Sequence, residues 1–369
     1  MNTKARVIAM YLPQYHPIPE NDAVWGKGFT EWTNVGRAKP LFRGHYQPRV
    51  PSDLGYYDLR LPEIRSAQAE LARKAGVEGF MYWHYWFGNG RQALERPFNE
   101  VVNSGEPDFP FCVGWGNHSW RNDQWQDATS RLGKTPFIFE QLYPGPEDHI
   151  QHFNSLLHAF KDKRYITVDG KLLFLIWDPK GIPDIESFIS LWNKLAQEQG
   201  LAGFHFVGLT GGSSEKQSKV FKLGLDAFCT DNQWIAESCV KGSYTRLIME
   251  KLGKFFPRIS PLKRFRYKDI IQHIFTQEDY KENVYPIIYP NWDRSPRSGR
   301  RATIYTGSTP ELFKKHVKDA IKIISDKSPE HRILILRSWN EWAEGNYMEP
   351  DLRFGLGYIN ALHDALTEQ

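Results

Sequence analysis

The sequence predicts an α/β fold, a single (β/α)8 TIM barrel with long loops on its C-terminal face. Eight short apolar runs recur along the 369 residues, with helix-like segments between them. That alternation is typical of parallel strands joined by crossover helices, and eight such units close a barrel. A minimal barrel takes about 250 residues, so the surplus is expected in loops. The runs lie at 7–11, 79–83, 111–115, 172–177, 204–209, 227–230, 284–288 and 333–338.

The helix expected at 61–76 has signals at both of its ends. A proline stands near its start, and Gly76 is its stop. Apolar residues recur at helical spacing, which indicates the face that packs on the barrel. Those residues are Ile64, Ala67, Leu71 and Ala75.

Two further helices are legible from their caps. The segment 184–200 begins with Asp184 as its N-cap and ends at Gly200. The segment 308–325 has Ser308 as the expected cap and Pro310 in its first turn. Its apolar stripe is expected to comprise Leu312, Val317 and Ile321.

Long connections follow three of the strands. The surplus lies at 13–57, at 117–143 and after the sixth run, where 232–280 holds several possible helices. Loops that follow barrel strands lie on the catalytic face. The sequence has no internal repeat, low-complexity segment or linker, so residues 1–369 are expected to form one domain.

Composition excludes several classes of protein. Hydrophobic residues make up 41% and charged residues 24%, as in an ordinary globular chain. The net charge of +4 is too mild to indicate binding to nucleic acid. No window approaches the 18 or so apolar residues of a membrane helix. The short apolar stretch 7–12 ends at Pro13 and resembles a strand, so no signal peptide is expected.

The cysteines and the aromatic residues each suggest a setting. Cys112, Cys229 and Cys239 have no metal-ligand spacing and cannot all pair, which favours a reduced, cytoplasmic location. Aromatic residues reach 14%, including 13 Trp. Such a number suggests stacking surfaces as well as core, and sugars are the obvious ligands for those faces.

Polar and aromatic side chains collect just beyond the apolar runs. Rings suit the C–H faces of a polyhydroxyl ligand, while amides and carboxylates suit its hydroxyl groups. Core packing is the alternative for any single aromatic residue. It does not explain polar residues at the same end of nearly every strand. The candidate sugar-binding residues are Tyr11, His16, Trp83, His84, Tyr85, Trp115, Asn117, Trp120, Asp231, Trp292, Asp293, Arg297, Trp339, Asn340 and Trp342.

The strongest candidates are Glu341 and Glu344, in a stretch that follows the last strand. Residues three apart in a helical turn lie on one face, with Cβ atoms about 5 to 6 Å apart. Two carboxylates that close raise each other's pKa, so one can hold a proton while the other stays ionised. Acids at a helix N-terminus are the alternative. Catalysis is favoured because Trp339 and Trp342, with Asn340 between them, would shield the pair from water.

The spacing also limits the mechanism. A conventional retaining glycosidase places its nucleophile and its acid on opposite sides of the anomeric carbon. Two side chains from one loop reach that arrangement poorly. They could instead act on neighbouring oxygens of one sugar, one drawing the proton from O2 while the other protonates the leaving oxygen.

Several long motifs together resemble the WbsX-type proteins, relatives of glycoside hydrolase family 99 that recur in bacterial polysaccharide biosynthesis. The resemblance spans nearly the whole chain. The motifs are MYLPQYHPIPENDAVWGKGFTEWTNV (10–35), KPLFRGHYQPRVPSDLGYYDLR (39–60), GFMYWHYWF (79–87), CVGWGNHSW (112–120), PNWDRSPR (290–297) and SWNEWAEG (338–345).

The resemblance implies a TIM barrel that acts on α-mannosidic linkages without a metal or other cofactor. NEWAEG is similar to the NEWHEG of family 99, with Ala343 where that family has His. By position, Glu341 would be the base towards the sugar 2-hydroxyl, giving a 1,2-anhydro sugar intermediate. Glu344 would be the acid, then the base, at the glycosidic oxygen. No spacing supports a metal site at His84 and Asp178.

Two basic segments suggest contact with negatively charged groups. The segment 251–268 has seven basic residues with aromatic residues among them. It could touch an anionic membrane surface peripherally, or be a solvated insertion with its aromatic residues packed on the barrel. Arg297, close to Arg294, Arg300 and Arg301, suggests an acidic group on the substrate.

The sequence therefore predicts a retaining glycoside hydrolase for α-linked, mannose-type bacterial surface polysaccharide. One alternative is a glycosyltransferase or transglycosylase of lipopolysaccharide O-antigen biosynthesis, although the chain has no DxD triplet or Gly-rich phosphate loop. Another is a barrel that binds glycans without catalysis. The oligomeric state is left open.

Overall fold

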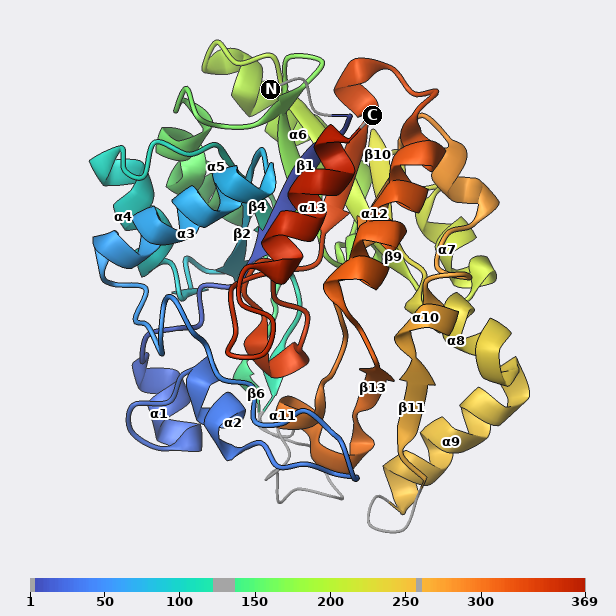
Figure 1. Cartoon of the computed structure of the whole chain (residues 1–369). Coiled ribbons are helices and arrows are strands. Elements are labelled where there is room, and N and C mark those ends of the chain that lie inside the picture. The colour runs from blue at the N-terminus through green and yellow to red at the C-terminus, as the bar shows by residue number, and fades with distance from the viewer. Residues whose placement is uncertain (1–3, 122–136, 257–260, 369) are drawn as a thin grey trace.

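The computed structural model describes residues 4–121, 137–256 and 261–368, and it forms a closed parallel barrel wrapped by helices (Figure 1). Every one of the eight predicted runs forms a barrel strand. Their apolar side chains are buried on both faces, as expected for strands covered by crossover helices. The barrel strands are β1 (Arg6–Tyr11), β2 (Gly79–Trp86), β4 (Phe111–Trp115), β8 (Lys171–Ile176), β9 (Phe204–Gly211), β10 (Ala227–Asp231), β12 (Val284–Ile288) and β14 (Ile333–Leu336).

Parallel pairing runs round the barrel in the order β1, β2, β4, β8, β9, β10, β12, β14 and back to β1. The closure joins the two ends of the chain, because Val7 pairs with Leu334 and Ile8 with Ile335. Two short strands extend the sheet by antiparallel pairing. These are β3 (Gln92–Ala93) on β2 and β7 (Thr167–Val168) on β8.

Helices connect successive strands and cover the outside of the barrel (Figure 1). The first and last of them meet, since α13 packs against both α3 and α12. The outer helices are α3 (Pro62–Ala75), α4 (Arg96–Ser104), α5 (Pro146–Phe160), α6 (Ile185–Glu198), α7 (Ser214–Val220), α8 (Gln233–Lys241), α12 (Pro310–Ile324) and α13 (Gly357–Thr367).

The helix caps follow the sequence with one correction. Asp184 accepts a hydrogen bond from the backbone N–H of Ser187 and caps α6. Gly76 ends α3 in the left-handed conformation. The cap of α12 is Thr309 and not Ser308, because Thr309 accepts the N–H of Leu312. The Ser308 hydroxyl donates to the carbonyl of Pro290 instead.

The buried stripes of α3 and α12 are rotated from the predicted ones. On α3, Arg65 and Gln68 are buried while Ile64 and Ala67 are only half-buried. The face turns because Gln68 takes part in a buried polar network, in which it accepts the Tyr11 hydroxyl at 2.7 Å. On α12 Val317 is buried as predicted, but Leu312 and Ile321 are only half-buried. The buried side chains are Phe313, His316, Val317, Ala320, Ile323 and Ile324.

The extra residues gather at the carboxyl ends of the barrel strands, below the barrel in Figure 1, opposite both termini. The predicted loop 117–143 lies partly outside the described residues, which omit 122–136. The elements of these loops are α1 (Pro19–Trp25), α2 (Glu31–Arg37), β5 (Trp120–Arg121), β6 (Phe137–Phe139), α9 (Ser243–Phe255), α10 (Tyr267–Ile270), α11 (Ser295–Ser298), and the paired β11 (Lys263–Arg266) and β13 (Thr303–Thr306).

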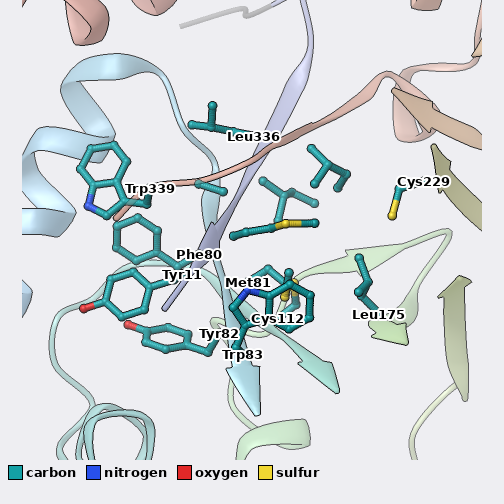
Figure 2. Close-up of a cluster of buried hydrophobic side chains, with 14 of the residues drawn as sticks. Tyr11, Phe80, Met81, Tyr82, Trp83, Cys112, Leu175, Cys229, Leu336 and Trp339 are labelled. Carbon is teal, nitrogen blue, oxygen red and sulfur yellow. The ribbon is translucent and has the colours of Figure 1, made fainter. Parts of the chain in front are cut away.

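The core fills the barrel and the space beneath its helices. Side chains from different strands converge on it, among them Met81, Cys112, Leu175 and Cys229 (Figure 2). Cys112 and Cys229 are buried free thiols, and Cys239 is an exposed free thiol. The three cysteines are therefore unpaired in this structure.

Candidate active site

A cavity of about 360 Å³ opens at the carboxyl ends of the barrel strands. Loops that follow several different strands contribute its walls. Both candidate glutamates line it, together with three arginines and a set of aromatic and amide side chains. The lining includes Glu341, Glu344, Arg294, Arg297, Arg337, Trp25, Trp83, Tyr85, Trp120, Trp177, His118, Gln14 and Asn21.

The two glutamates are held by a tight turn after β14. Glu341 precedes a 3₁₀ turn, η5 (Trp342–Glu344), so its side chain and that of Glu344 face the same cavity. The Ser338 hydroxyl accepts the N–H of Glu341 at 3.0 Å. Asn340 ties the turn to the end of β1, since its Oδ1 accepts the N–H of Leu12 at 2.7 Å. The bond between Asn340 and Leu12 thus fixes the turn to the barrel.

Gly345 is required where this turn ends. Its φ is +67°, and a Cβ there would lie 2.9 Å from the backbone N of Asp293. That close approach lets the Asp293 N–H donate to the carbonyl of Glu344 at 2.8 Å. Only glycine adopts this conformation and spacing without strain. The loop after β12 therefore packs directly against the glutamate turn.

Arginines control the charge of Glu344. Burial acts to raise the pKa of Glu344, but Arg294, Arg297 and Arg337 outweigh burial and hold that pKa down to about 2. Arg294 places its Nη2 3.1 Å from Oε1 of Glu344. Arg297 donates to the same oxygen. Glu344 is therefore a carboxylate in the unliganded protein at neutral pH.

The pKa of Glu341 is shifted in the opposite direction. Burial, followed by the negative charge of Glu344, raises the pKa of Glu341 to about 7, against the opposing effect of Arg337 and Arg297. Its Oε2 accepts only a long hydrogen bond, 3.3 Å, from the side-chain amide of Asn346. Near neutral pH Glu341 is therefore only partly protonated, while Glu344 stays ionised.

Glu31 is a third carboxylate beside the pair, and it did not stand out in the sequence. It lies in α2, is fully buried, and accepts the N–H of Ala343 at 3.0 Å. Its other oxygen lies 3.4 Å from Nη2 of Arg297. Its place within the motif 10–35 was the available signal, but nothing in that motif distinguishes Glu31 from its neighbours.

Aromatic side chains form one wall of the cavity. Trp83 packs edge to face against Trp177, with ring centroids 5.3 Å apart. Tyr85 packs in the same way against Trp120 at 4.8 Å. Burial lowers the pKa of neighbouring His118 to about 4, so this imidazole is neutral at physiological pH. Of the predicted sugar-binding aromatic residues, Trp83, Tyr85 and Trp120 lie on the cavity surface.

Four other predicted residues lie behind the site, around the buried carboxyl group of Glu349. Trp342 donates its indole N–H to Glu349 at 2.7 Å, and the Tyr57 hydroxyl donates to it at 2.9 Å. Gln68 donates to it as well, at 2.6 Å. The predicted residues in this region are Tyr11, Trp339, Asn340 and Trp342, all essentially inaccessible and none of them on the cavity lining.

Four more predicted residues are buried in the surrounding structure. His84 contacts His152, with their Nε2 atoms 2.9 Å apart, and burial lowers the pKa of His84 to about 3. Asn117 holds the backbone of Asp178 through hydrogen bonds of 2.7 and 2.8 Å. His16 and Trp115 are also buried and away from the lining of this cavity.

Three more predicted residues line other hollows and not the cavity of the glutamates. These are Asp231, Trp292 and Asp293. Asp231 binds Arg337 at 2.7 Å and, with Trp292, lines an adjoining hollow of about 290 Å³. Asp293 is held by His45 at 2.9 Å and faces a separate hollow of about 190 Å³. The position of Asp293 shortly after the seventh strand gave no indication that it lies outside the cavity of the glutamates.

The described residues contain no group of three or more His, Cys, Asp or Glu side chains arranged to hold a metal ion. Within the same residues, no helix is long and apolar enough to cross a membrane.

The structure describes part of the basic segment 251–268. Phe265 of β11 is buried, but Phe255 and Phe256 are 68% and 56% exposed, so these two rings do not pack on the barrel. Arg258 and the side chain of Lys254 lie outside the described residues. Contact with a membrane surface stays a prediction.

Comparison with known sequences gives consistent matches. A family model described as "Glycosyltransferase WbsX" matches residues 7–362. A protein described as "Uncharacterized protein WxcX", from Xanthomonas campestris pv. campestris strain B100, is 30% identical over 98% of this chain. WxcX of a second strain is 31% identical over the same share. The chain spans about half the length of these relatives, 50% in each.

Solved structures share the fold. One described as "Glycoside hydrolase-like protein" superposes with a TM-score of 0.63 at 14% identity, covering 99% of this chain and 94% of the other. A family 99 endo-α-mannosidase from Bacteroides thetaiotaomicron superposes with a TM-score of 0.55 at 15% identity, covering 98% and 95%.

Proposed function

The chain belongs to the WbsX glycosyltransferase family, and from that premise we propose that it is a carbohydrate-active enzyme that acts on glycosidic bonds through Glu341 and Glu344. The observation that carries the proposal is the cavity: two carboxyl groups with opposite pKa shifts line one aromatic-walled space at the carboxyl ends of barrel strands. Strand ends of this kind are where TIM-barrel enzymes hold their catalytic groups.

The proposed roles follow the resemblance to family 99. Glu341 draws the proton from the sugar 2-hydroxyl, so that O2 attacks the anomeric carbon and a 1,2-anhydro sugar forms. Its pKa of about 7 leaves a substantial share of Glu341 ionised at neutral pH, and this ionised form is the base. Glu344 protonates the departing oxygen and later activates the incoming water or acceptor. Because Glu344 is ionised in the unliganded protein, it must gain a proton when the ligand binds.

The proposed substrate is an α-linked, mannose-type glycan of a bacterial surface polysaccharide. The sugar and the linkage rest on the resemblance to family 99. The cavity supports a saccharide more generally, since Trp83, Trp177 and Trp120 offer ring faces beside the amide groups of Gln14 and Asn21.

Transfer of the sugar to an acceptor is the second candidate function, favoured by the description of the family as glycosyltransferases. The same pair would serve either reaction. A hydroxyl of another sugar would take the place of water at the anomeric carbon. The active-site chemistry is otherwise the same.

Product analysis separates these candidates. Bacterial surface polysaccharides would be incubated with the protein, with and without acceptor sugars, and the products followed by mass spectrometry. Shortened glycans without acceptor indicate hydrolysis, and glycan mass added to the acceptor indicates transfer. Proton NMR of the first-formed anomer should show retention for either. If the protein binds a glycan that stays unchanged after long incubation, the barrel binds without catalysis.

A further inference from the structure

Two arginines share one carboxylate oxygen in the cavity. Arg294 and Arg297 both contact Oε1 of Glu344. A guanidinium normally binds a carboxylate through two parallel N–H groups, one to each oxygen. Here the Nε of Arg294 is buried and has no hydrogen-bond partner among the described residues. Glu344 therefore leaves part of the binding capacity of Arg294 unused.

The carboxyl groups on the glutamate turn and on α2 carry fewer negative charges than the three arginines carry positive charges. Burial raises the pKa of Glu31, and burial with the charge of Glu344 raises that of Glu341 to about 7. Arg337, which also faces Glu344, is already paired with Asp231 at 2.7 Å.

The strands on the opposite side of the cavity supply no charge. Tyr85 of β2 is neutral, because burial raises its pKa. His118, which follows β4, is neutral because burial lowers its pKa to about 4. The cavity therefore contains three positively charged arginines and fewer ionised carboxylates. Its net positive charge would attract an anion.

Arg294 is the arginine that such an anion reaches first. Its side chain is 40% exposed, whereas those of Arg297 and Arg337 are 18% and 7% exposed. Arg294 also lines the adjoining hollow that contains Trp234 and Arg301, so its guanidinium stands where the two spaces meet. Arg297 is more deeply placed, between Glu344 and Glu31.

We propose that Arg294 and Arg297 bind an anionic group of the ligand, a carboxylate or phosphate carried by a sugar, and that this group replaces Glu344 as their partner. The inference rests on the proposed function, in which Glu344 is the acid. Once the ligand anion neutralises the arginines, Glu344 takes up one proton from solvent. It gives that proton to the departing glycosidic oxygen and is a carboxylate again.

Calorimetric titration tests the binding step. The probes are mannose, mannuronate and mannose 1-phosphate, titrated at low ionic strength and pH 6. The protein should bind at least one of the two anions at least about tenfold more tightly than mannose, as charge-assisted hydrogen bonds require. Preference for mannuronate points to an acidic glycan, and preference for mannose 1-phosphate points to a sugar-phosphate donor. Inorganic phosphate, titrated alone, shows whether the sugar is needed; phosphate bound as tightly as the sugar anions would contradict a sugar-borne ligand.

Arg294→Met should remove the preference for the anion while leaving the affinity for mannose in place. Arg96→Met is the matched control, because Arg96 is an exposed residue paired with Glu100 and is not part of the cavity lining. It should keep the preference. Equal affinities for all three probes, or an unchanged preference in Arg294→Met, would overturn the proposal.

A separate measurement tests whether Glu344 takes up a proton when the anion binds. Titrating the favoured anion in two buffers of different ionisation enthalpy reports the protons taken up on binding. The wild type should take up as much as one proton, and Glu344→Gln should bind the anion at least as tightly with a smaller uptake. Anion binding with no uptake in the wild type would overturn the exchange of partners. These titrations need no turnover, so an inactive protein that prefers the anion would refute only the proposed function.

Discussion

At the scale of single residues, the site separates two neighbouring carboxyl groups by their surroundings. Glu341 and Glu344 come from one turn and line one cavity, yet within the described residues arginines form ion pairs with Glu344 and not with Glu341. Burial without such contacts makes a carboxyl group a weak acid, and cations beside it make it a strong one. The two carboxyl groups therefore titrate at different pH, which lets them take different roles in acid–base chemistry on a glycosidic bond.

Glu349 should make the protein less stable as pH rises. Burial raises its pKa to about 7, despite the donors that surround it. An unfolded glutamate titrates near pH 4.3, so above that value unfolding releases a proton that the folded state retains. The contribution to stability is complete below about pH 4 and lost by pH 7 to 8, on the order of 3 kcal/mol.

Urea unfolding of the wild type and Glu349→Gln at pH 5 and pH 8 measures this effect. The free energy of unfolding should fall more steeply with pH in the wild type, since glutamine does not titrate. Glu278→Gln, a substitution of a partly exposed carboxyl group, should keep the wild-type slope. Identical slopes in the wild type and Glu349→Gln would show that Glu349 is ionised in the folded protein.

The sequence located the glutamate pair but not the full wall of the cavity. Glu341 and Glu344 could be recognised because they follow a buried strand, three residues apart. Tyr11 and Trp339 also stand at strand ends, but they turn inward to the core and not towards the cavity. Whether a strand-end side chain is buried depends on the loops that cover it, here 12–61 and 338–356. No short-range sequence pattern predicts the paths of these loops.

At the scale of elements, hydrophobic runs were enough to identify the strands. All eight lie where the apolar pattern indicated, since parallel strands are buried on both faces. The faces of α3 and α12 were less predictable. Gln68 is buried because Tyr11 and Glu349 bind it, and a pattern that counts only apolar residues cannot anticipate such a partner.

Gly345 should be the residue of the glutamate turn that tolerates substitution least. Alanine there would adopt a positive φ and also meet the backbone of Asp293. Gly355 is a matched control, because its φ is +49° but open space surrounds it. We expect Gly355→Ala to lose about 1 kcal/mol of stability. Gly345→Ala should lose at least about 1 kcal/mol more, with a larger fall in activity.

Chemical denaturation followed by tryptophan fluorescence would measure both variants beside the wild type. Equal losses in the two variants would mean that the contact with Asp293 does not constrain the turn.

At the scale of the whole molecule, the ends of the chain complete the barrel. β1 pairs with β14, and α13 packs on α3 as well as on α12. We propose that residues 1–369 form one domain, because the first and last elements contribute to the same core. The glutamate turn is bound to Leu12 across that closure, so the site depends on the closed barrel.

A single domain should unfold in one transition. Urea unfolding followed by far-UV circular dichroism and by tryptophan fluorescence should give coincident curves, since both signals report one cooperative unit. Two separated transitions would indicate that part of the barrel folds independently.

The most direct test of the central claim is the turnover of a glycan substrate by Glu341→Gln and Glu344→Gln, measured by mass spectrometry beside the wild type and Glu278→Gln. Both cavity variants should lose at least about 10²-fold in rate, the contribution of a positioned acid or base, while keeping the far-UV circular dichroism of the wild type. Glu278→Gln should keep full activity. Wild-type turnover in either cavity variant would show that the paired carboxyl groups do not carry out the reaction.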